Sequence, residues 1–226
     1  MCGRFAVTTP PEAMRQLFGT RNPLPNAPSR TNIAPTDRVL AVRFDATDRH
    51  RSLDLLRWGL VPHWAKQIAG PPLINARAES LAERPAFRQA FEKRRCLIPA
   101  DAFYEWQADR KPKQPFAIRR ADGAVMAFAG LWENWRQPDG SWLRSVAIVT
   151  TTANAALAVL HDRMPVLLEP ADWPAWLGET GATADALRPL LRPCPSDALV
   201  FYPVSRAVNK VGNEGPELLA PEPASA

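Results

Sequence analysis

The sequence predicts an α+β fold in a single domain, with a largely antiparallel twisted sheet or barrel-like core and short helices at its periphery. The chain has 226 residues, which suits one domain at roughly 100 to 200 residues each. Strand-like runs follow one another through its middle, without the strict strand and helix alternation of a Rossmann-like sheet. The 24 prolines are about twice the usual share of roughly 5% and disfavour long helices.

Individual elements follow from local patterns. Thr9 and Glu12 have capping-box spacing, with Pro10 at the first helical position, so a short helix should begin there and end at Gly19. Helical spacing of Phe87 and Phe91 predicts a second helix, Asn154 can cap a third, two further short helices fit the segments that follow, and strand-like runs predict the strands. The predicted helices are 10–18, 86–94, 154–160, 171–177 and 184–191, and the predicted strands are 39–44, 52–58, 96–99, 103–107, 115–119, 125–132, 142–151 and 199–203.

Two segments stand apart from these elements. Residues 59–73 carry three prolines and two glycines, which predicts a long loop of the kind that often serves function. Residues 214–226 contain three prolines and no aromatic residue, which is typical of a loose end. We therefore place the domain at 1–215 and expect 216–226 to be a loose C-terminal tail.

Composition narrows the class of protein. Hydrophobic residues make up 46% and charged residues 23%, so a substantial core can form. There is no apolar run of membrane-spanning length and no signal-peptide pattern at the start, so we expect a cytoplasmic protein that does not enter a membrane. Three widely spaced cysteines give neither a disulfide framework nor a metal site, and there is no Gly-rich phosphate loop, so we expect no metal and no cofactor.

The charge balance makes nucleic acid a plausible partner. The chain has a formal net charge of +5, and its basic residues are mostly arginine, whose planar fork of donors suits phosphate. Genome composition alone can also favour arginine over lysine, so this observation leaves both explanations open.

Cys2 is the most informative residue. If Met1 is removed, the chain begins with an amine and a thiol on one residue. An α-amine has a pKa of about 7.7 to 8.0, against about 10.4 for lysine, so part of it is nucleophilic at neutral pH. An aldehyde could form a Schiff base with this amine, and the thiol could then close a five-membered thiazolidine. The alternative is that Cys2 is an ordinary small residue near the start of the chain.

Three further polar residues have both chemical and structural interpretations. Strand alternation puts Glu105 on the same face as Phe103, where its carboxylate is either buried with a raised pKa or exposed at an edge. His161 follows an apolar segment and could simply cap the end of a helix. Asn75 follows a proline-rich segment and could be a turn residue.

The order of several motifs resembles the SOS response-associated peptidase family. The resemblance runs from residue 1 to about 215, through eight blocks in the family's order. These blocks are MCGRF (1–5), NIAPT (32–36), WGLVPHWAK (58–66), INARAE (74–79), RRCLIPADAFYEW (94–106), FAGLWE (128–133), HDRMP (161–165) and PVSRAVN (203–209).

The resemblance implies that Cys2 forms a thiazolidine crosslink with the ring-opened aldehyde of abasic sites in single-stranded DNA. It implies that Asn75 orients Cys2 or the opened sugar, that Glu105 is the acid-base residue and that His161 assists proton transfer. It also implies a set of DNA contacts, in which arginines hold phosphate, tryptophans stack and the others line the pocket. These are Arg4, Arg77, Arg163, Trp64, Trp106, Pro35 and Thr150.

We therefore expect an enzyme that captures abasic sites covalently and shields them during DNA repair or replication, with the peptidase, hydrolase or lyase-type activity associated with the family. We expect a monomer that associates with the nucleoid when bound to DNA. One departure concerns Pro85, which stands where the family often carries an arginine. Two alternatives stay open: a thiol peptidase or amidohydrolase that uses Cys2, and a non-covalent reader of single-stranded DNA.

Overall fold

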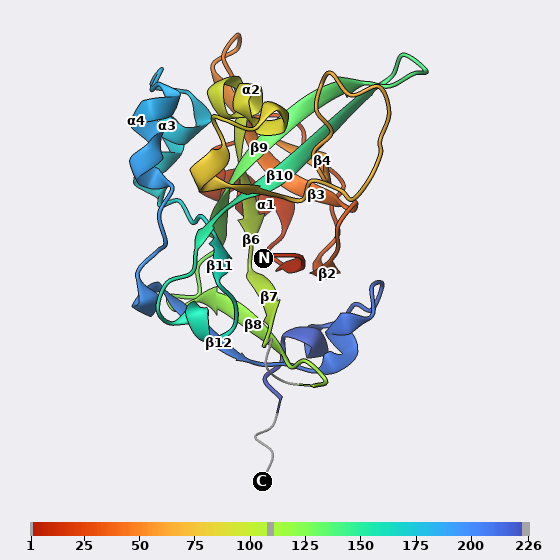
Figure 1. Ribbon diagram of the computed structural model, residues 1–226, viewed down its shortest axis with the longest axis vertical. Helices are drawn as coiled ribbons and strands as arrows, with labels where there is room; N and C mark the ends of the chain where they lie inside the picture. Colours follow the sequence, from red (N-terminus) through yellow and green to blue (C-terminus); the bar gives the residue numbers. More distant parts are fainter. Residues whose placement is uncertain (1, 108–110, 223–226) are drawn as a thin grey trace.

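Two β-sheets form the framework of the molecule (Figure 1). The computed structural model describes residues 2–107 and 111–222. The smaller sheet has the order β12-β8-β7-β1-β2 and is antiparallel throughout. Its strands are β1 (Phe5–Val7), β2 (Arg30–Ile33), β7 (Ala102–Trp106), β8 (Pro115–Arg120) and β12 (Leu199–Pro203).

The larger sheet closes on itself. Its path runs β11-β10-β4-β3-β6-β9, and β9 pairs again with β10, so five strands form a ring from which β11 and β5 extend. Most pairs are antiparallel, but β10 runs parallel to β4 and β5. The closed ring confirms the predicted barrel-like core. Its strands are β3 (Arg38–Asp45), β4 (His50–Trp58), β5 (Asn75–Arg77), β6 (Arg95–Ala100), β9 (Met126–Arg136), β10 (Trp142–Thr152) and β11 (Arg163–Pro165).

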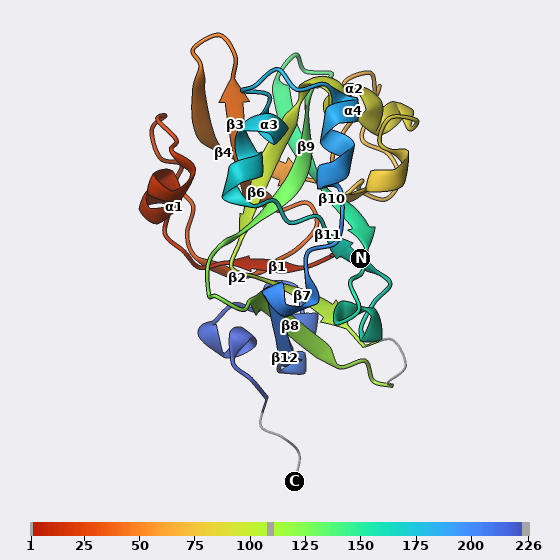
Figure 2. The same cartoon turned by 90° about the vertical axis from the view of Figure 1, so that its left-hand side faces the viewer.

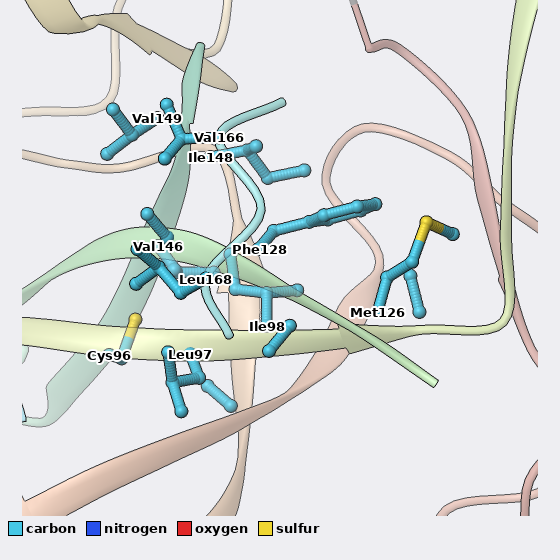
Figure 3. Close-up of a cluster of buried hydrophobic side chains, with 14 of the residues drawn as sticks. Cys96, Leu97, Ile98, Met126, Phe128, Val146, Ile148, Val149, Val166 and Leu168 are labelled. Carbon is cyan, nitrogen blue, oxygen red and sulfur yellow. The ribbon is translucent and has the colours of Figure 1, made fainter. Parts of the chain in front are cut away.

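The main hydrophobic core fills the space bounded by β6, β9 and β10 (Figure 3). Ile98, Phe128 and Ile148 are fully buried there. Gly130 on β9 lies directly over Cys96 of the neighbouring strand, and a Cβ at this glycine would lie 2.7 Å from the Cys96 Sγ. The close approach of these two strands therefore depends on the missing side chain.

Four short helices lie at the periphery of the sheets (Figure 2). They are α1 (Pro11–Phe18), α2 (Pro85–Lys93), α3 (Trp173–Leu177) and α4 (Ala184–Leu187). The helix α1 ends at Gly19, in the left-handed conformation that favours glycine, as predicted. The predicted capping box is wrong, because Pro10 is the N-cap and the Thr9 hydroxyl donates to Asp101 instead, at 2.6 Å.

Three other helix predictions were too long. The segment 154–160 holds only a 3-10 turn at Leu157–Val159, although the Asn154 side chain accepts from the Leu157 N–H as a cap should. The segment 171–177 begins as a 3-10 turn, and 184–191 becomes one from Arg188, where Pro189 lacks the N–H that an α-helix needs.

The segment expected to be a loose tail is partly ordered. Pro216–Leu219 forms a 3-10 turn, and Leu218 is buried in a small cluster with Tyr104 and Val208. The tail prediction is therefore wrong for 216–222, and residues 223–226 lie outside the described residues. Across the described residues, no helix is both long and apolar enough to cross a membrane.

Candidate active site

Cys2 lies just before β1, beside the end of β7. The strand register pairs Phe5 with Phe103, and the Tyr104 N–H donates to the Arg4 carbonyl at 3.0 Å. Because the two strands are antiparallel, the start of the chain meets the end of β7, where Glu105 lies. Cys2 is fully buried, and this burial, followed by the charge of Glu105, raises the pKa of its thiol. The sulfur is therefore held as the neutral thiol.

Glu105 is a buried carboxylate on the core-facing side of β7. Phe103 belongs to the main core, whereas Tyr104 and Trp106 belong to the smaller cluster on the other face, as strand alternation predicted. Glu105 is 4% exposed. Burial, and then the nearby negative charge of Asp162, raise the pKa of its carboxyl. Of the two alternatives from the sequence, the structure shows the buried carboxyl with the raised pKa.

Asn75 reaches Cys2 from the other sheet. It begins β5, which runs parallel to β10 with Asn75 opposite Ile148. Its Nδ2 donates to the Cys2 carbonyl oxygen at 2.9 Å. Its Oδ1 is buried and, among residues 2–107 and 111–222, has no hydrogen-bond partner. A buried acceptor without a donor costs free energy, so this oxygen is available to a ligand hydroxyl or amine.

His161 lies on the segment before β11 and has two competing contacts at one ring nitrogen. Its Nδ1 is 3.0 Å from the Arg163 backbone nitrogen and 2.7 Å from the Asp162 Oδ1. The neutral ring accepts from the Arg163 N–H, whereas the protonated ring donates to Asp162. Burial, together with the charges of Lys113 and Arg163, lowers the pKa of His161, while Asp162 opposes this effect.

Arg4, just before β1, and Trp106, at the end of β7, both contact the segment near residue 208. One Arg4 nitrogen donates to the Asn32 Oδ1 at 2.7 Å and to the Val208 carbonyl at 2.9 Å. The guanidinium carbon lies 6.0 Å from the centre of the Trp106 ring. The Trp106 Nε1 in turn donates to the Asn209 Oδ1 at 2.6 Å. These side chains are thus already held in place, and sequence reasoning missed the partners because they lie far away in the chain.

Arg163 forms a two-pronged ion pair with Glu79, at 2.7 and 2.9 Å. The same guanidinium donates to the carbonyl of Thr150, which is fully buried. Arg77, at the end of β5, is exposed. Of these two arginines, Arg77 is the more accessible to a phosphate, whereas Arg163 would share one with Glu79.

Pro35 lies near the same end of β1 as Cys2. It follows Ile33, which pairs with Phe5 in an antiparallel register, so the chain after Ile33 runs back toward the N-terminus. The next residue, Thr36, has a φ of 78°. That is a strained conformation for a β-branched residue, and the Thr36 N–H donates to the Trp58 carbonyl at 2.8 Å.

Trp64 is 57% exposed on the loop 59–73. Its two neighbours are anchored to β9. The His63 N–H donates to the buried Glu133 carboxylate at 3.0 Å, and the Trp135 Nε1 donates to the Ala65 carbonyl at 2.5 Å. The loop is therefore fastened on both sides of the protruding ring. Within residues 2–107 and 111–222, no hydrogen bond, ion pair or ring contact joins Trp64 to Cys2. Sequence reasoning did not single out Glu133 or Trp135.

Comparisons with known proteins place the chain in a family. Residues 1–211 match the family model described as SOS response associated peptidase (SRAP). The chain belongs to this family. Among the described residues of this SRAP protein, no group of three or more histidines, cysteines or carboxylates could hold a metal ion.

Several curated proteins are similar to this chain along nearly all of its own length. The abasic site processing protein YoqW of Bacillus subtilis is 40% identical over 97% of this chain and 99% of its own. The abasic site processing protein YedK of Escherichia coli is 34% identical over 98% of this chain and 100% of its own. The abasic site processing protein HMCES of Mus musculus is 32% identical over 98% of this chain and 76% of its own.

Solved structures share the fold. A protein from Bacteroides thetaiotaomicron superposes with a TM-score of 0.86 at 20% identity, over 98% of this chain and 100% of its own. A phage-related protein from Bordetella bronchiseptica gives a TM-score of 0.71 at 32% identity, over 91% of this chain and 95% of its own. The α+β fold of this SRAP protein is therefore shared with experimentally determined structures.

Proposed function

We propose that this protein captures abasic sites in single-stranded DNA by forming a thiazolidine between Cys2 and the ring-opened sugar. The observation that carries the proposal is the convergence of two sheets on Cys2, with Asn75 bound to its carbonyl and Glu105 at the facing end of β7. The names of the relatives support the same substrate, because several are described as abasic site processing proteins.

The proposed reaction releases one water molecule. Once Met1 is removed, the Cys2 amine adds to the sugar aldehyde and gives a carbinolamine. Loss of hydroxide, protonated as water, gives the Schiff base. The thiol sulfur then bonds to the same carbon while its proton moves to the nitrogen side, and the five-membered ring closes. No oxidant or reductant is needed.

The environment of Cys2 fits this order of events. The α-amine is the better first nucleophile, because burial raises the pKa of the thiol and keeps it protonated. The raised pKa of Glu105 lets a carboxylic acid persist toward neutral pH, where it can donate a proton to the departing hydroxyl and afterwards take the thiol proton. A single group can thus serve both steps.

His161 and Asn75 have complementary roles in the proposal. A lowered pKa keeps the His161 ring neutral near pH 7, where it can accept a proton as the sugar ring opens. The unpartnered Oδ1 of Asn75 can accept from the amine or from a sugar hydroxyl. Arg4, Arg77, Arg163, Trp64, Trp106, Pro35 and Thr150 are the proposed DNA contacts around this centre.

A denaturing gel tests the proposal directly. The purified protein, mixed with a single-stranded oligonucleotide that contains one abasic site, should give a shifted band that survives heating. Cys2→Ala should give none, and Cys2→Ser should give at most a Schiff base that appears only after reduction. An equal band from Cys2→Ala would overturn the proposal. Intact mass should show the loss of one water from the sum of the two components.

The family description supports a second candidate, a thiol peptidase in which Cys2 attacks an acyl carbon. That reaction needs a thiolate, and the raised pKa of the buried thiol disfavours it. Turnover of an amide substrate without DNA, abolished in Cys2→Ala, would favour the peptidase over the crosslinking reaction.

A further inference from the structure

A basic and aromatic depression lies near the turn that joins β9 to β10. It has a volume of about 340 Å³ and is lined by Arg38, Leu55, Arg57, Trp142, Leu143 and Arg144. We propose that this depression binds the sugar-phosphate backbone and a base of the single strand that continues from the lesion. The inference rests on the proposed function, because it assigns a second contact area to the same DNA.

The arrangement of charge is the first argument. Arg38 and Arg57 stand directly opposite each other on β3 and β4. Like charges in this position destabilise an antiparallel pair, so the pairing of β3 with β4 does not account for this arrangement. No ion pair in residues 2–107 and 111–222 involves Arg38, Arg57 or Arg144. Within the described residues, these three guanidinium groups therefore have no anionic partner. A DNA phosphate would supply one.

The second argument concerns Trp142. Its side chain is 60% exposed at the start of β10, and Arg136 stands opposite it on β9. An exposed indole beside unpaired arginines is the combination that holds single strands, because the arginines follow the backbone and the ring stacks on a base. Duplex DNA keeps its bases stacked inside and offers no such face. The aromatic ring therefore favours a single strand as the occupant.

The third argument is continuity with the site around Cys2. Arg57 lines this depression and also the cavity of about 520 Å³ under the loop that carries Trp64. On β10, Ser145 pairs with Arg57 and Ile148 pairs with Asn75. Three residues of a strand span roughly 10 Å, so Arg57 and Asn75 are separated by about that distance along β10. The loop 59–73 also contacts the hairpin, because the Trp135 Nε1 on β9 donates to the Ala65 carbonyl, and the two segments are seen together in Figure 1.

Arg57 is held in a fixed position between the two hollows. Its guanidinium donates to the Gly59 carbonyl at 2.7 Å. Gly59 has a φ of 125°, and a Cβ there would lie 3.0 Å from the Arg57 guanidinium. Glycine thus permits this approach. Because Arg57 supports the loop, the test leaves it unchanged and removes its neighbours instead.

The test measures non-covalent binding as a function of salt, in a Cys2→Ala background where no crosslink forms. Each phosphate contact on a single strand contributes about 0.7 to the slope of log affinity against log salt. Arg38→Ala with Arg144→Ala should therefore make the slope shallower by about 1.4 on a long oligonucleotide. A short oligonucleotide that carries little more than the abasic site should bind both proteins equally.

Arg21→Ala with Arg192→Ala is the matched control, since both residues are exposed and the same charge is lost far from the hairpin. An unchanged slope in the Arg38 and Arg144 variant, or an equal loss in the control or on the short oligonucleotide, would overturn the proposal. Trp142→Ala should weaken binding of the long single strand by at least about fivefold and leave duplex binding unchanged.

These outcomes are separate from those of the crosslinking reaction. If the wild-type protein forms no heat-stable band, the thiazolidine proposal fails, while the salt dependence on undamaged single strands still decides whether the hairpin contacts DNA. If crosslinking occurs and the slope does not change, the hairpin proposal alone fails.

Discussion

The Asn75 side chain is bonded to the Cys2 backbone, with Nδ2 donating to the carbonyl oxygen at 2.9 Å. This bond crosses from the larger sheet to the smaller one, because Asn75 lies on β5 and Cys2 precedes β1. It fixes the backbone of Cys2, the proposed nucleophile, relative to the barrel. Cys2 is fully buried and its carbonyl is held by this hydrogen bond, so its amine and thiol should be presented in one orientation.

Asn75→Ala should slow crosslinking by about tenfold or more, because 1.4 kcal/mol of lost positioning corresponds to a factor of ten. The expected loss of folding stability is about 1 kcal/mol, the net worth of one hydrogen bond. Single-turnover gels and urea unfolding measure the two effects. Asn75→Asp keeps the acceptor and removes the donor, so a normal rate in that variant would show that the bond to Cys2 is dispensable.

Glu105→Gln should slow crosslinking by roughly 10² to 10⁴, the usual contribution of a general acid-base group. The same change should stabilise the fold at alkaline pH. The folded pKa of Glu105 is raised, so the folded state binds its proton more tightly than the unfolded state, and stability falls as pH rises from the unfolded pKa of about 4.3 through the folded value.

Thermal unfolding of both proteins as a function of pH checks the sign of this effect. The melting temperatures of wild type and Glu105→Gln should converge near pH 4 and separate toward pH 8, with the variant higher. A variant that is less stable at pH 8 would mean that the ionised carboxylate contributes favourable contacts which outweigh the cost of its burial.

Glu79→Gln should tighten binding to abasic oligonucleotides, because Glu79 occupies the Arg163 guanidinium that a phosphate would otherwise use. The salt slope should become steeper by about 0.7, the value for one additional phosphate contact. Fluorescence anisotropy provides the measurement, and Glu83→Gln, at an exposed glutamate nearby, controls for charge alone. Weaker binding in Glu79→Gln would instead show that this ion pair positions Arg163.

Gly130→Ala should destabilise the barrel by about 1 to 3 kcal/mol through overpacking. The new methyl group would lie 2.7 Å from the Cys96 Sγ and 2.9 Å from the Ile98 Cδ1. The free energies of unfolding in urea of Gly130→Ala, Cys96→Ala and the double variant, compared with wild type, give a double-mutant cycle. The double variant should be more stable than additivity predicts, because removing the sulfur makes room for the methyl group. Strict additivity would contradict direct steric contact between the two positions.

The predicted core strands were confirmed where the chain supplies long apolar runs. The strands β9 and β10 are 11 residues each, and β12 was placed at its observed bounds. The strands that sequence reasoning missed, β1, β2, β5 and β11, have three or four residues. Such short segments show no periodicity of their own. They become strands because a neighbouring strand completes their hydrogen bonds.

The site divides in a similar way. The chemistry of Cys2 and the alternation that buries Glu105 were visible in the chain, since both depend on adjacent residues. The contacts that hold the site residues were not visible there. Arg4 is held by Asn32 and Val208, which are 28 and 204 residues away in the sequence. Glu133, which accepts a hydrogen bond from the His63 N–H in the Trp64 loop, is 70 residues from His63 in the sequence. No local pattern reports such contacts.

The sequence by itself determined the class of fold and the positions of the main strands along the chain, because these follow from hydrophobic periodicity. It also determined which residues have distinctive chemistry, because this follows from side-chain type. Only the tertiary structure decided that the barrel closes through β9 and β10, that Cys2 is buried against Glu105 and Asn75, and that Arg38, Arg57 and Arg144 meet Trp142. Each of these depends on segments brought together by the packing of a shared core, and such proximity has no signature in the local order of residues.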